Sequence, residues 1–123
     1  MALVILTDQL PRNIFRGTPR AFATDHRALA TARLAVEAGF DHDVDRLLRQ
    51  FFYLPFMHAE DRRAQAASLA LYRAHGDPTN LHFAEHHHDI VRRFGRFPHR
   101  NAVLGRESTP DEIAFLETDD FRG

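Results

Sequence analysis

Apolar residues recur along this chain mostly at the three- and four-residue spacing of helix faces. The short apolar segment from Ala2 to Gln9 could form a strand by its length, but no partner strand follows, so we predict a helix that Pro11 stops. Thr18 is a typical N-cap residue, Pro19 after it suits the first position of a helix, and Gly39 is typical of a helix end. These residues predict a second helix between Thr18 and Gly39. The apolar stripe of this second helix consists of Phe22, Leu29, Ala32 and Val36.

The most apolar segment follows, and we predict a third helix that is interrupted at Pro55. Its first residue is one of three aspartates, Asp41, Asp43 or Asp45. Two further helices span about 59–75 and 80–94, and each ends at a glycine. Thr109 and Glu112 have the capping-box spacing that opens a last short helix.

The connections between these helices are two to six residues long, which favours antiparallel neighbours. The pattern therefore predicts an all-α fold of antiparallel helical hairpins, with about five to six helices in a single domain over residues 1–123. With 44% hydrophobic residues and eleven phenylalanines, the chain has enough apolar material for a packed core.

Composition excludes several kinds of chemistry. The chain has no cysteine, which excludes disulfides, thiolate nucleophiles and cysteine-ligated metals. All sixteen basic residues are arginine, which excludes a lysine Schiff base. With a net charge of −1, the molecule as a whole is not expected to attract nucleic acid over long range. The first apolar run, of five residues, is too short for a signal peptide or a membrane span, so we expect a cytoplasmic protein with no membrane contact.

Two helices carry polar residues on apolar stripes. His87 shares a stripe with Phe83, Ile90 and Phe94, which predicts that it points toward the core. His82 and His86 have the i, i+4 spacing of a metal pair, but a solvated face explains them more simply, so we predict no metal. In the preceding helix, one stripe is polar at its start and apolar at its end, and consists of His58, Asp61, Gln65, Leu69 and Tyr72. Its polar part either begins the helix at the rim of the domain or lines a pocket.

Two blocks rich in arginine, asparagine and carboxylate also contain large apolar residues, which predicts that both are held against the core. The polar residues of the first block are Asp8, Gln9, Arg12, Asn13 and Arg16. Those of the second, which lies within 94–109, are Arg96, His99, Arg100, Asn101 and Arg106. One interpretation is an internal network in which the arginines are neutralised by Asp8, Glu60, Asp61 and Glu112.

The other interpretation is a cleft, lined by arginine and histidine, that binds an anionic small molecule or an acidic peptide. Its ligand-binding candidates are the polar residues of both blocks except His99, together with Gln65 and Arg93. An alternative is a hydrolase, with or without a divalent metal, whose catalytic candidates are His58, Asp61, His87 and His99. Arginines interleaved with phenylalanines also allow RNA binding, which near-neutral charge disfavours. No known catalytic or phosphate-binding motif is present, and we predict no cofactor.

Three long motifs carry a family resemblance: TDQLPRNIFRGT followed by AFATD, YLPFMHAEDRRAQ, and HHDIVRRFGRFPHRNAVLGRESTPDE. With the helices between them they cover nearly the whole chain, which resembles the bacterial domain-of-unknown-function family numbered 924. The resemblance implies a tetratricopeptide-like, right-handed stack of hairpins and implies no activity. The family's polar pattern carries over onto Asp8, Gln9, Arg12, Asn13, Arg16, His58, Glu60, Asp61, Gln65, His87, Arg93, Arg96, His99, Arg100, Asn101, Arg106, Ser108 and Thr109, and with them Pro11.

The resemblance also implies a difference at the front of the chain. Members of the family usually carry further helices, some with tryptophan, before the segment that begins here at Met1, and this chain has no tryptophan. Relative to the family, the domain is therefore expected to be truncated at its N-terminus. An apolar helix face built for those helices would be uncovered, so we predict a homodimer that covers this face.

Overall fold

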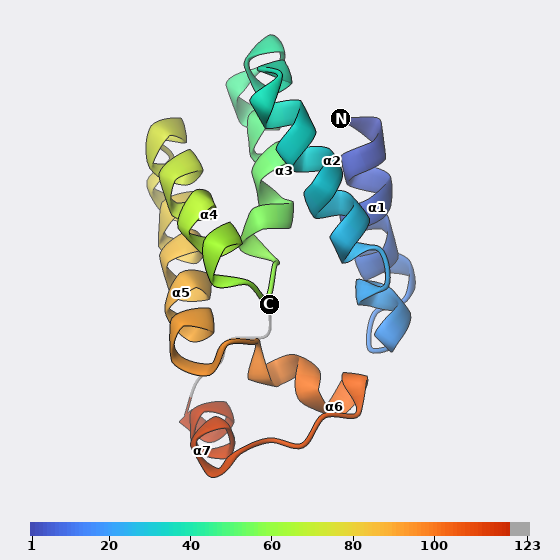
Figure 1. Ribbon diagram of the computed structural model, residues 1–123, viewed down its shortest axis with the longest axis vertical. Helices are drawn as coiled ribbons and strands as arrows, with labels where there is room; N and C mark the ends of the chain where they lie inside the picture. Colours follow the sequence, from blue (N-terminus) through green and yellow to red (C-terminus); the bar gives the residue numbers. More distant parts are fainter. Residues whose placement is uncertain (119–123) are drawn as a thin grey trace.

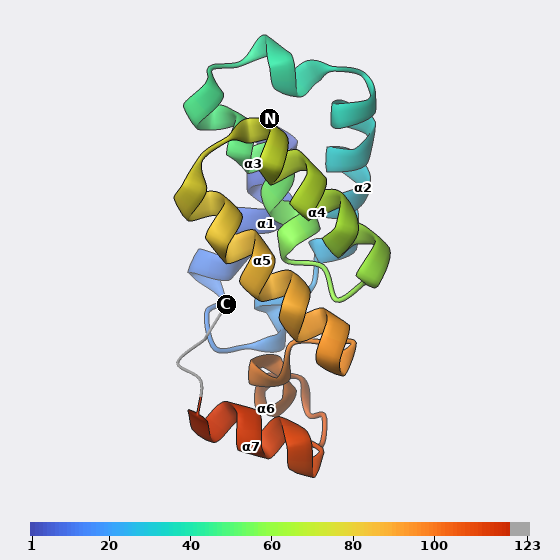
Figure 2. The ribbon, with the colours of Figure 1, turned by 90° about the vertical axis from the view of Figure 1, so that its left-hand side faces the viewer.

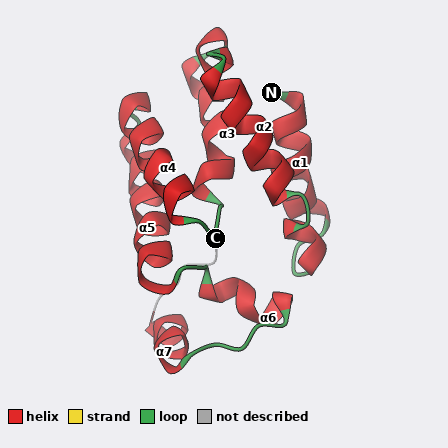
Figure 3. Cartoon of the chain, viewed as in Figure 1, coloured by secondary structure: helices red, strands yellow, loops and turns green. Residues whose placement is uncertain are grey.

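Five helices run up and down beside one another and form the body of the molecule (Figures 1 and 3). The structure is a computed structural model that describes residues 1–118, apart from the side chain of Thr7. Each helix packs chiefly on its neighbour in the sequence, so that successive helices lie antiparallel. These helices are α1 (Ala2–Ile14), α2 (Asp25–Glu37), α3 (Arg46–Met57), α4 (Arg62–His75) and α5 (Pro78–Phe94).

Shorter elements complete the described part of the chain, and two of them lie below the five-helix body (Figure 2). These two are the four-residue α6 (Asn101–Leu104) and α7 (Pro110–Thr118). Three 3-10 turns precede helices: η1 (Pro19–Phe22), η2 (Phe40–Asp43) and η3 (Pro98–Arg100). Residues 1–118 contain no strand, so the all-α prediction is confirmed. None of the helices in these residues has the length and apolarity needed to cross a membrane.

Helix ends follow local capping chemistry. The Asp61 carboxylate accepts a hydrogen bond from the Ala64 N–H at 2.8 Å and caps α4. The predicted capping box of α7 is confirmed, because Thr109 and Glu112 each accept the other's backbone N–H, at 3.2 and 2.9 Å. Gly76 and Gly95 end α4 and α5 with positive φ, a conformation that glycine adopts without steric cost.

Two predicted helix breaks are wrong. Pro11 lies within α1 and Pro55 within α3, and both prolines are buried. A proline removes one backbone hydrogen bond and costs about 3 kcal/mol or more inside an isolated helix. Here each proline sits in the last turns of its helix, and packing against the core offsets that cost, so the helix continues for two or three residues.

Two other expectations need correction. The segment after Thr18 does not form one helix to Gly39, because η1 ends at Phe22 and α2 begins only at Asp25. Phe83 does not share the buried face of His87 but is exposed on α5. Four-residue spacing places two side chains within about 40° of each other around a helix, so one can lie at the edge of the contact and the other inside it.

The apolar side chains gather in two cores. The larger lies among α1 to α5 and contains Phe52, Tyr53, Phe56 and Tyr72. The smaller joins the end of α5 to α7; its buried residues are Ile90, Val91, Phe97 and Phe115. Between the two cores runs the segment from His58 to Glu60, which connects α3 to α4 and lies beside the second arginine block. The candidate site forms at this junction.

Candidate functional site

Asp8 places a carboxylate in the interior of the junction. It is 1% exposed, because α1 turns this position toward α3. Its Oδ1 accepts a hydrogen bond from Arg12 at 2.7 Å and lies 3.1 Å from Nδ1 of His58, and its other oxygen accepts one from Gln9. Burial raises the pKa of Asp8, but the hydrogen bond to His58 and the positive charge of Arg12 outweigh it, so the net pKa is lowered.

Arg12 links the first block to α2. Its two terminal nitrogens donate to the two oxygens of Asp25, each at 3.0 Å, in the bidentate geometry that arginine favours. Burial raises the pKa of Asp25, although the charges of Arg12 and Arg100 oppose the shift. Asp25 was not predicted as a network residue. Its only signal in the sequence is its position as the last residue of the AFATD motif.

Arg100 is the most deeply buried arginine of the junction. It is 5% exposed, and its Nη2 donates to the His58 carbonyl at 2.9 Å. Its Nη1 lies 3.6 Å from Asp25 and 3.8 Å from Glu60. The guanidinium also stacks over two phenylalanine rings, with its central carbon 4.4 and 4.7 Å from the centroids. Burial, together with the charge of Arg12, lowers the pKa of Arg100 to about 10.

Glu60 connects the turn before α4 to the second block. Its oxygens accept two hydrogen bonds from Arg106, at 3.0 and 2.9 Å, and one from the Phe97 N–H at 2.8 Å. Arg106 also donates to the side-chain oxygen of Asn101 at 3.0 Å. Burial raises the pKa of Glu60, but these hydrogen bonds and the nearby guanidinium charges outweigh it and lower the net pKa.

A separate ion pair fixes the start of α7. Arg96 donates to both oxygens of Glu112, at 2.9 and 2.8 Å. The Arg96 hydrogen bond is the largest cause that lowers the pKa of Glu112 to about 2. Because Glu112 also caps the helix through the Thr109 N–H, this pair joins the second block to α7.

These contacts tie the two blocks to each other through shared carboxylates. Asp25 lies between Arg12 and Arg100, and Glu60 lies between Arg100 and Arg106. We call this set the junction network; its members are Asp8, Arg12, Asp25, His58, Glu60, Arg100 and Arg106. Every guanidinium in it faces at least one carboxylate, so the junction network is an internally neutralised structure.

The other predicted binding residues lie around the network. Asn13 and Arg16 are exposed, and the side chain of Asn13 donates to the carbonyl of Gln9 in its own helix. Gln65 is fully buried, and its amide nitrogen donates to the carbonyls of Met57 and Ala59 at 2.7 and 2.8 Å. It therefore holds the turn between α3 and α4 in place.

Of the catalytic candidates, the structure brings two histidines together. The ring centroids of His58 and His87 are 6.1 Å apart, and the ring of His99 is tilted against that of Phe97, with centroids 5.8 Å apart. Burial lowers the pKa of His58, and burial together with the charge of His58 lowers that of His87 to about 3. Both histidines are therefore neutral in the folded protein at neutral pH.

Asp61 lies apart from these histidines, because it caps α4 and its carboxylate is 3.9 Å from Arg33 of α2. His82 is exposed on α5, and His86 is half-buried on the same helix. Within the described residues, no group of three histidine or carboxylate side chains is placed to hold a metal ion. Within residues 1–118, Asp61 is thus separate from the pair of histidines, His58 and His87.

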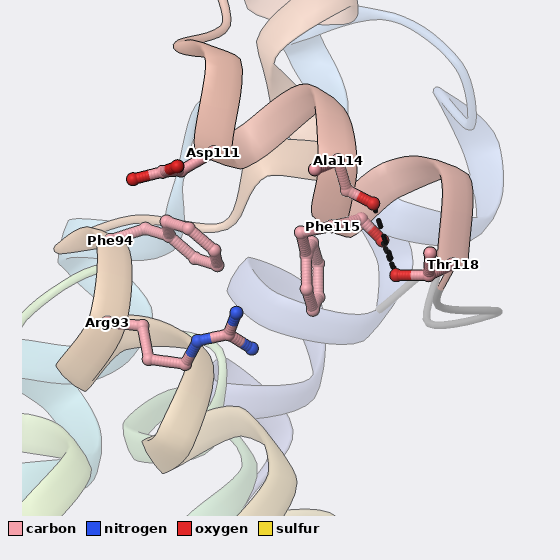
Figure 4. A pocket seen from close by; sticks show the side chains of 6 residues that line it. All are labelled: Arg93, Phe94, Asp111, Ala114, Phe115 and Thr118. Atoms are coloured by element: carbon pink, nitrogen blue, oxygen red, sulfur yellow. Dashed lines mark hydrogen bonds between the residues drawn. The ribbon is translucent and has the colours of Figure 1, made fainter.

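Arg93 lines a cavity of about 480 Å³ between the end of α5 and α7 (Figure 4). Its guanidinium carbon lies 4.8 Å from the ring centroid of Phe94 and 5.4 Å from that of Phe115, and it points into the space between the two rings. Asp111 lines the same cavity, as do Ala114 and Thr118. Within residues 1–118, Arg93 forms no salt bridge, which sets it apart from the arginines of the junction network.

A smaller cavity of about 70 Å³ lies between α4 and α5 and is lined by Arg62, Gln65, His88, Val91 and Arg92. Neither of these two cavities is lined by any arginine of the junction network. Of the ligand-binding residues predicted from the sequence, Arg93 thus lies in the larger cavity and Gln65 in the smaller.

Comparison with known proteins places the chain in a family. A solved structure of a protein of unknown function from Agrobacterium tumefaciens, ATU0120, is similar with a TM-score of 0.91 and 52% sequence identity. The similarity covers 96% of this chain and 66% of that protein, so the chain spans less than two thirds of its neighbour's length. No curated protein matches the chain. The profile of the bacterial proteins of unknown function called DUF924 matches residues 1–120, and the chain therefore belongs to that family.

Proposed function

We propose that this chain is a binding domain whose cavity between α5 and α7 receives a carboxylate attached to an apolar group. One observation carries the proposal: the exposed guanidinium of Arg93 points between two phenylalanine rings and forms no salt bridge within the described residues. A carboxylate would accept two parallel hydrogen bonds from Arg93, and its apolar group would contact Phe94 and Phe115.

The junction network is a poorer receptor for the same ligand. Its arginines already face Asp8, Asp25 and Glu60, so an anion would have to displace a carboxylate of the protein itself. Breaking a buried ion pair typically costs about 3–5 kcal/mol. At the Arg93 cavity, no carboxylate of residues 1–118 forms a salt bridge with the guanidinium, so an entering carboxylate has no ion pair of these residues to break.

The cavity also limits the kind of anion. It is open to solvent and has a volume of about 480 Å³, and the rings of Phe94 and Phe115 form part of its wall. Asp111 at the same cavity adds negative charge, which disfavours polyphosphates and other multiply charged anions. We therefore propose a ligand with a single carboxylate, either a free arylalkanoic acid or an acidic side chain of a peptide.

Isothermal titration calorimetry with 3-phenylpropionate, inorganic phosphate and a peptide containing one Glu–Phe pair tests the proposal. We expect binding of the phenylpropionate or the peptide but not of phosphate, and the better of the two ligands identifies the source of the carboxylate. Arg93→Gln should weaken binding about tenfold or more. The matched control is Arg92→Gln, since Arg92 is its exposed neighbour on α5 and pairs with Asp89 instead. Equal loss in both variants, or no binding by any carboxylate, would refute the proposal.

A further inference from the structure

The outward side of α1 carries four large apolar side chains, spread from one end of the helix to the other. Leu3, Leu6, Leu10 and Ile14 are 51%, 53%, 42% and 60% exposed. Their spacings of three, four and four residues place them on one stripe of the helix. Single exposed leucines are common on protein surfaces, whereas a continuous apolar stripe usually marks an interaction surface.

Both charged residues of α1 point away from this stripe. The side chain of Asp8 is 2% exposed and that of Arg12 is 18% exposed, and both belong to the junction network. Among the described side chains of α1, the exposed ones are uncharged: Ala2, Leu3, Leu6, Leu10, Asn13 and Ile14. Depletion of charge around large apolar side chains is typical of the core of a protein interface.

The helix lies where a partner can reach it. It packs on α2 and α3 with its inner side, and in Figure 1 it forms the edge of the molecule on the side away from α4 and α5. The Arg93 cavity is lined by residues of α5 and α7. In Figure 1, α5 lies on the opposite side of the body from α1, and α7 lies below the body. The α1 face and the cavity are therefore separate surfaces.

We propose that this face binds the same face of a second copy of the chain, with the two α1 helices antiparallel. An uncharged stripe offers no recognition to a charged partner, but it can meet its own copy without like-charge repulsion. The stripe is also nearly symmetric about its midpoint between positions 8 and 9, so a two-fold axis there brings Leu3 near Ile14 of the other copy. Under the same axis, Leu6 faces the neighbourhood of Leu10 in the other copy.

The size of the face sets the expected strength. A helix of 13 residues is about 20 Å long and about 10 Å wide, which is less than the roughly 800 Å² per partner of a standard interface. We therefore expect a reversible dimer with a Kd of about 1–100 µM rather than a permanent one.

Sedimentation velocity from 1 to 200 µM tests for the dimer. The wild-type chain should pass from monomer to dimer over this range, and Leu6→Glu should remain monomeric because it places a charge in the centre of the interface. The matched control is Ile113→Glu, which changes a residue of similar exposure (48%) on α7 and should dimerise as the wild type does. A wild-type chain that is monomeric at every concentration overturns the proposal.

Cysteine crosslinking tests the orientation, and the chain has no cysteine of its own to interfere. In the antiparallel pair, two copies of residue 10 lie about 5 Å apart along the axis, whereas two copies of residue 3 lie about 16 Å apart. Leu10→Cys should therefore form a disulfide-linked dimer under mild oxidation, and Leu3→Cys should not. Crosslinking of Leu3→Cys without Leu10→Cys, or of neither, contradicts the antiparallel pair even if either variant is less stable than the wild type.

Discussion

Arg100 and Arg93 are surrounded by the same aromatic chemistry and yet differ in what they can do. Each guanidinium lies over two phenylalanine rings at 4.4–5.4 Å. Arg100 is 5% exposed and faces Asp25 and Glu60, whereas Arg93 is exposed and forms no salt bridge within the described residues. The aromatic rings therefore position an arginine, and the nearby carboxylates determine whether it is structural or available to a ligand.

Removing Arg100 should have the largest effect on stability. Arg100→Met removes a positive charge that faces Asp25 and Glu60, and it removes the hydrogen bond that Arg100 donates to the His58 carbonyl. We expect the free energy of unfolding to fall by about 3–5 kcal/mol. Urea denaturation at pH 7.5 measures it, with the exposed Arg16→Met as control. A loss below about 1 kcal/mol would show that the junction network is not a structural requirement.

Glu60→Gln should be the next largest change. The amide can still accept from one neighbour, but it cannot neutralise Arg106 and Arg100 or accept two charged hydrogen bonds. We expect a loss of about 2–3 kcal/mol. A double-mutant cycle with Arg106→Gln, followed by urea denaturation, should give a coupling energy of about 1–2 kcal/mol. A coupling near zero would mean that Glu60 acts through the Phe97 N–H alone.

Acid should weaken the junction through its histidines. The pKa of His87 is lowered to about 3 in the folded protein, so between pH 6.5 and 3 the unfolded chain binds a proton that the folded chain does not. The contribution of neutral His87 to the free energy of unfolding is therefore complete above pH 6.5 and is lost as the pH falls. At pH 5 the loss from His87 alone is about 2 kcal/mol. Urea denaturation of the wild type at pH 7.5 and 5.0 measures the loss, and His87→Gln should reduce it. A pH-independent wild type would contradict the neutral, buried state of His87.

Arg93→Gln should change stability least. It removes stacking on Phe94 and Phe115 at an exposed position, which is worth about 0.5–1 kcal/mol, and it breaks no ion pair within the described residues. Thermal unfolding without ligand should therefore shift by a few degrees at most. A loss as large as that of Arg100→Met would remove the distinction between the two arginines and with it the argument for a free binding group.

Local signals in the sequence predicted much of the fold. The glycines after α4 and α5 and the capping box of Thr109 and Glu112 mark real helix ends, because these features act within four residues of the chain. The breaks at Pro11 and Pro55 were wrong, since the prolines are buried and packing compensates for the missing hydrogen bond. Local propensity could not reveal this packing.

The site was predicted in composition but not in its pairing. The two arginine blocks lie in contact through shared carboxylates. Asp8, Glu60 and Glu112 pair with arginines of these blocks, as the interpretation of an internal network predicted. Asp61 caps α4 instead, and Asp25, whose one signal in the sequence is its place at the end of the AFATD motif, takes a central position in the network. Pairing across 13 to 75 residues depends on how the helices stack, which local spacing does not determine.

The sequence by itself determined that this is a helical chain, where most helices end, and that two arginine-rich segments lie against apolar residues. These properties follow from backbone hydrogen bonding and from side-chain spacing within a few residues. Only the tertiary structure decided which arginines are neutralised, that α1 turns Asp8 inward and its leucines outward, and that Arg93 points into a cavity. Burial and charge pairing depend on side chains brought together from distant parts of the chain, and only the folded arrangement of helices sets those distances.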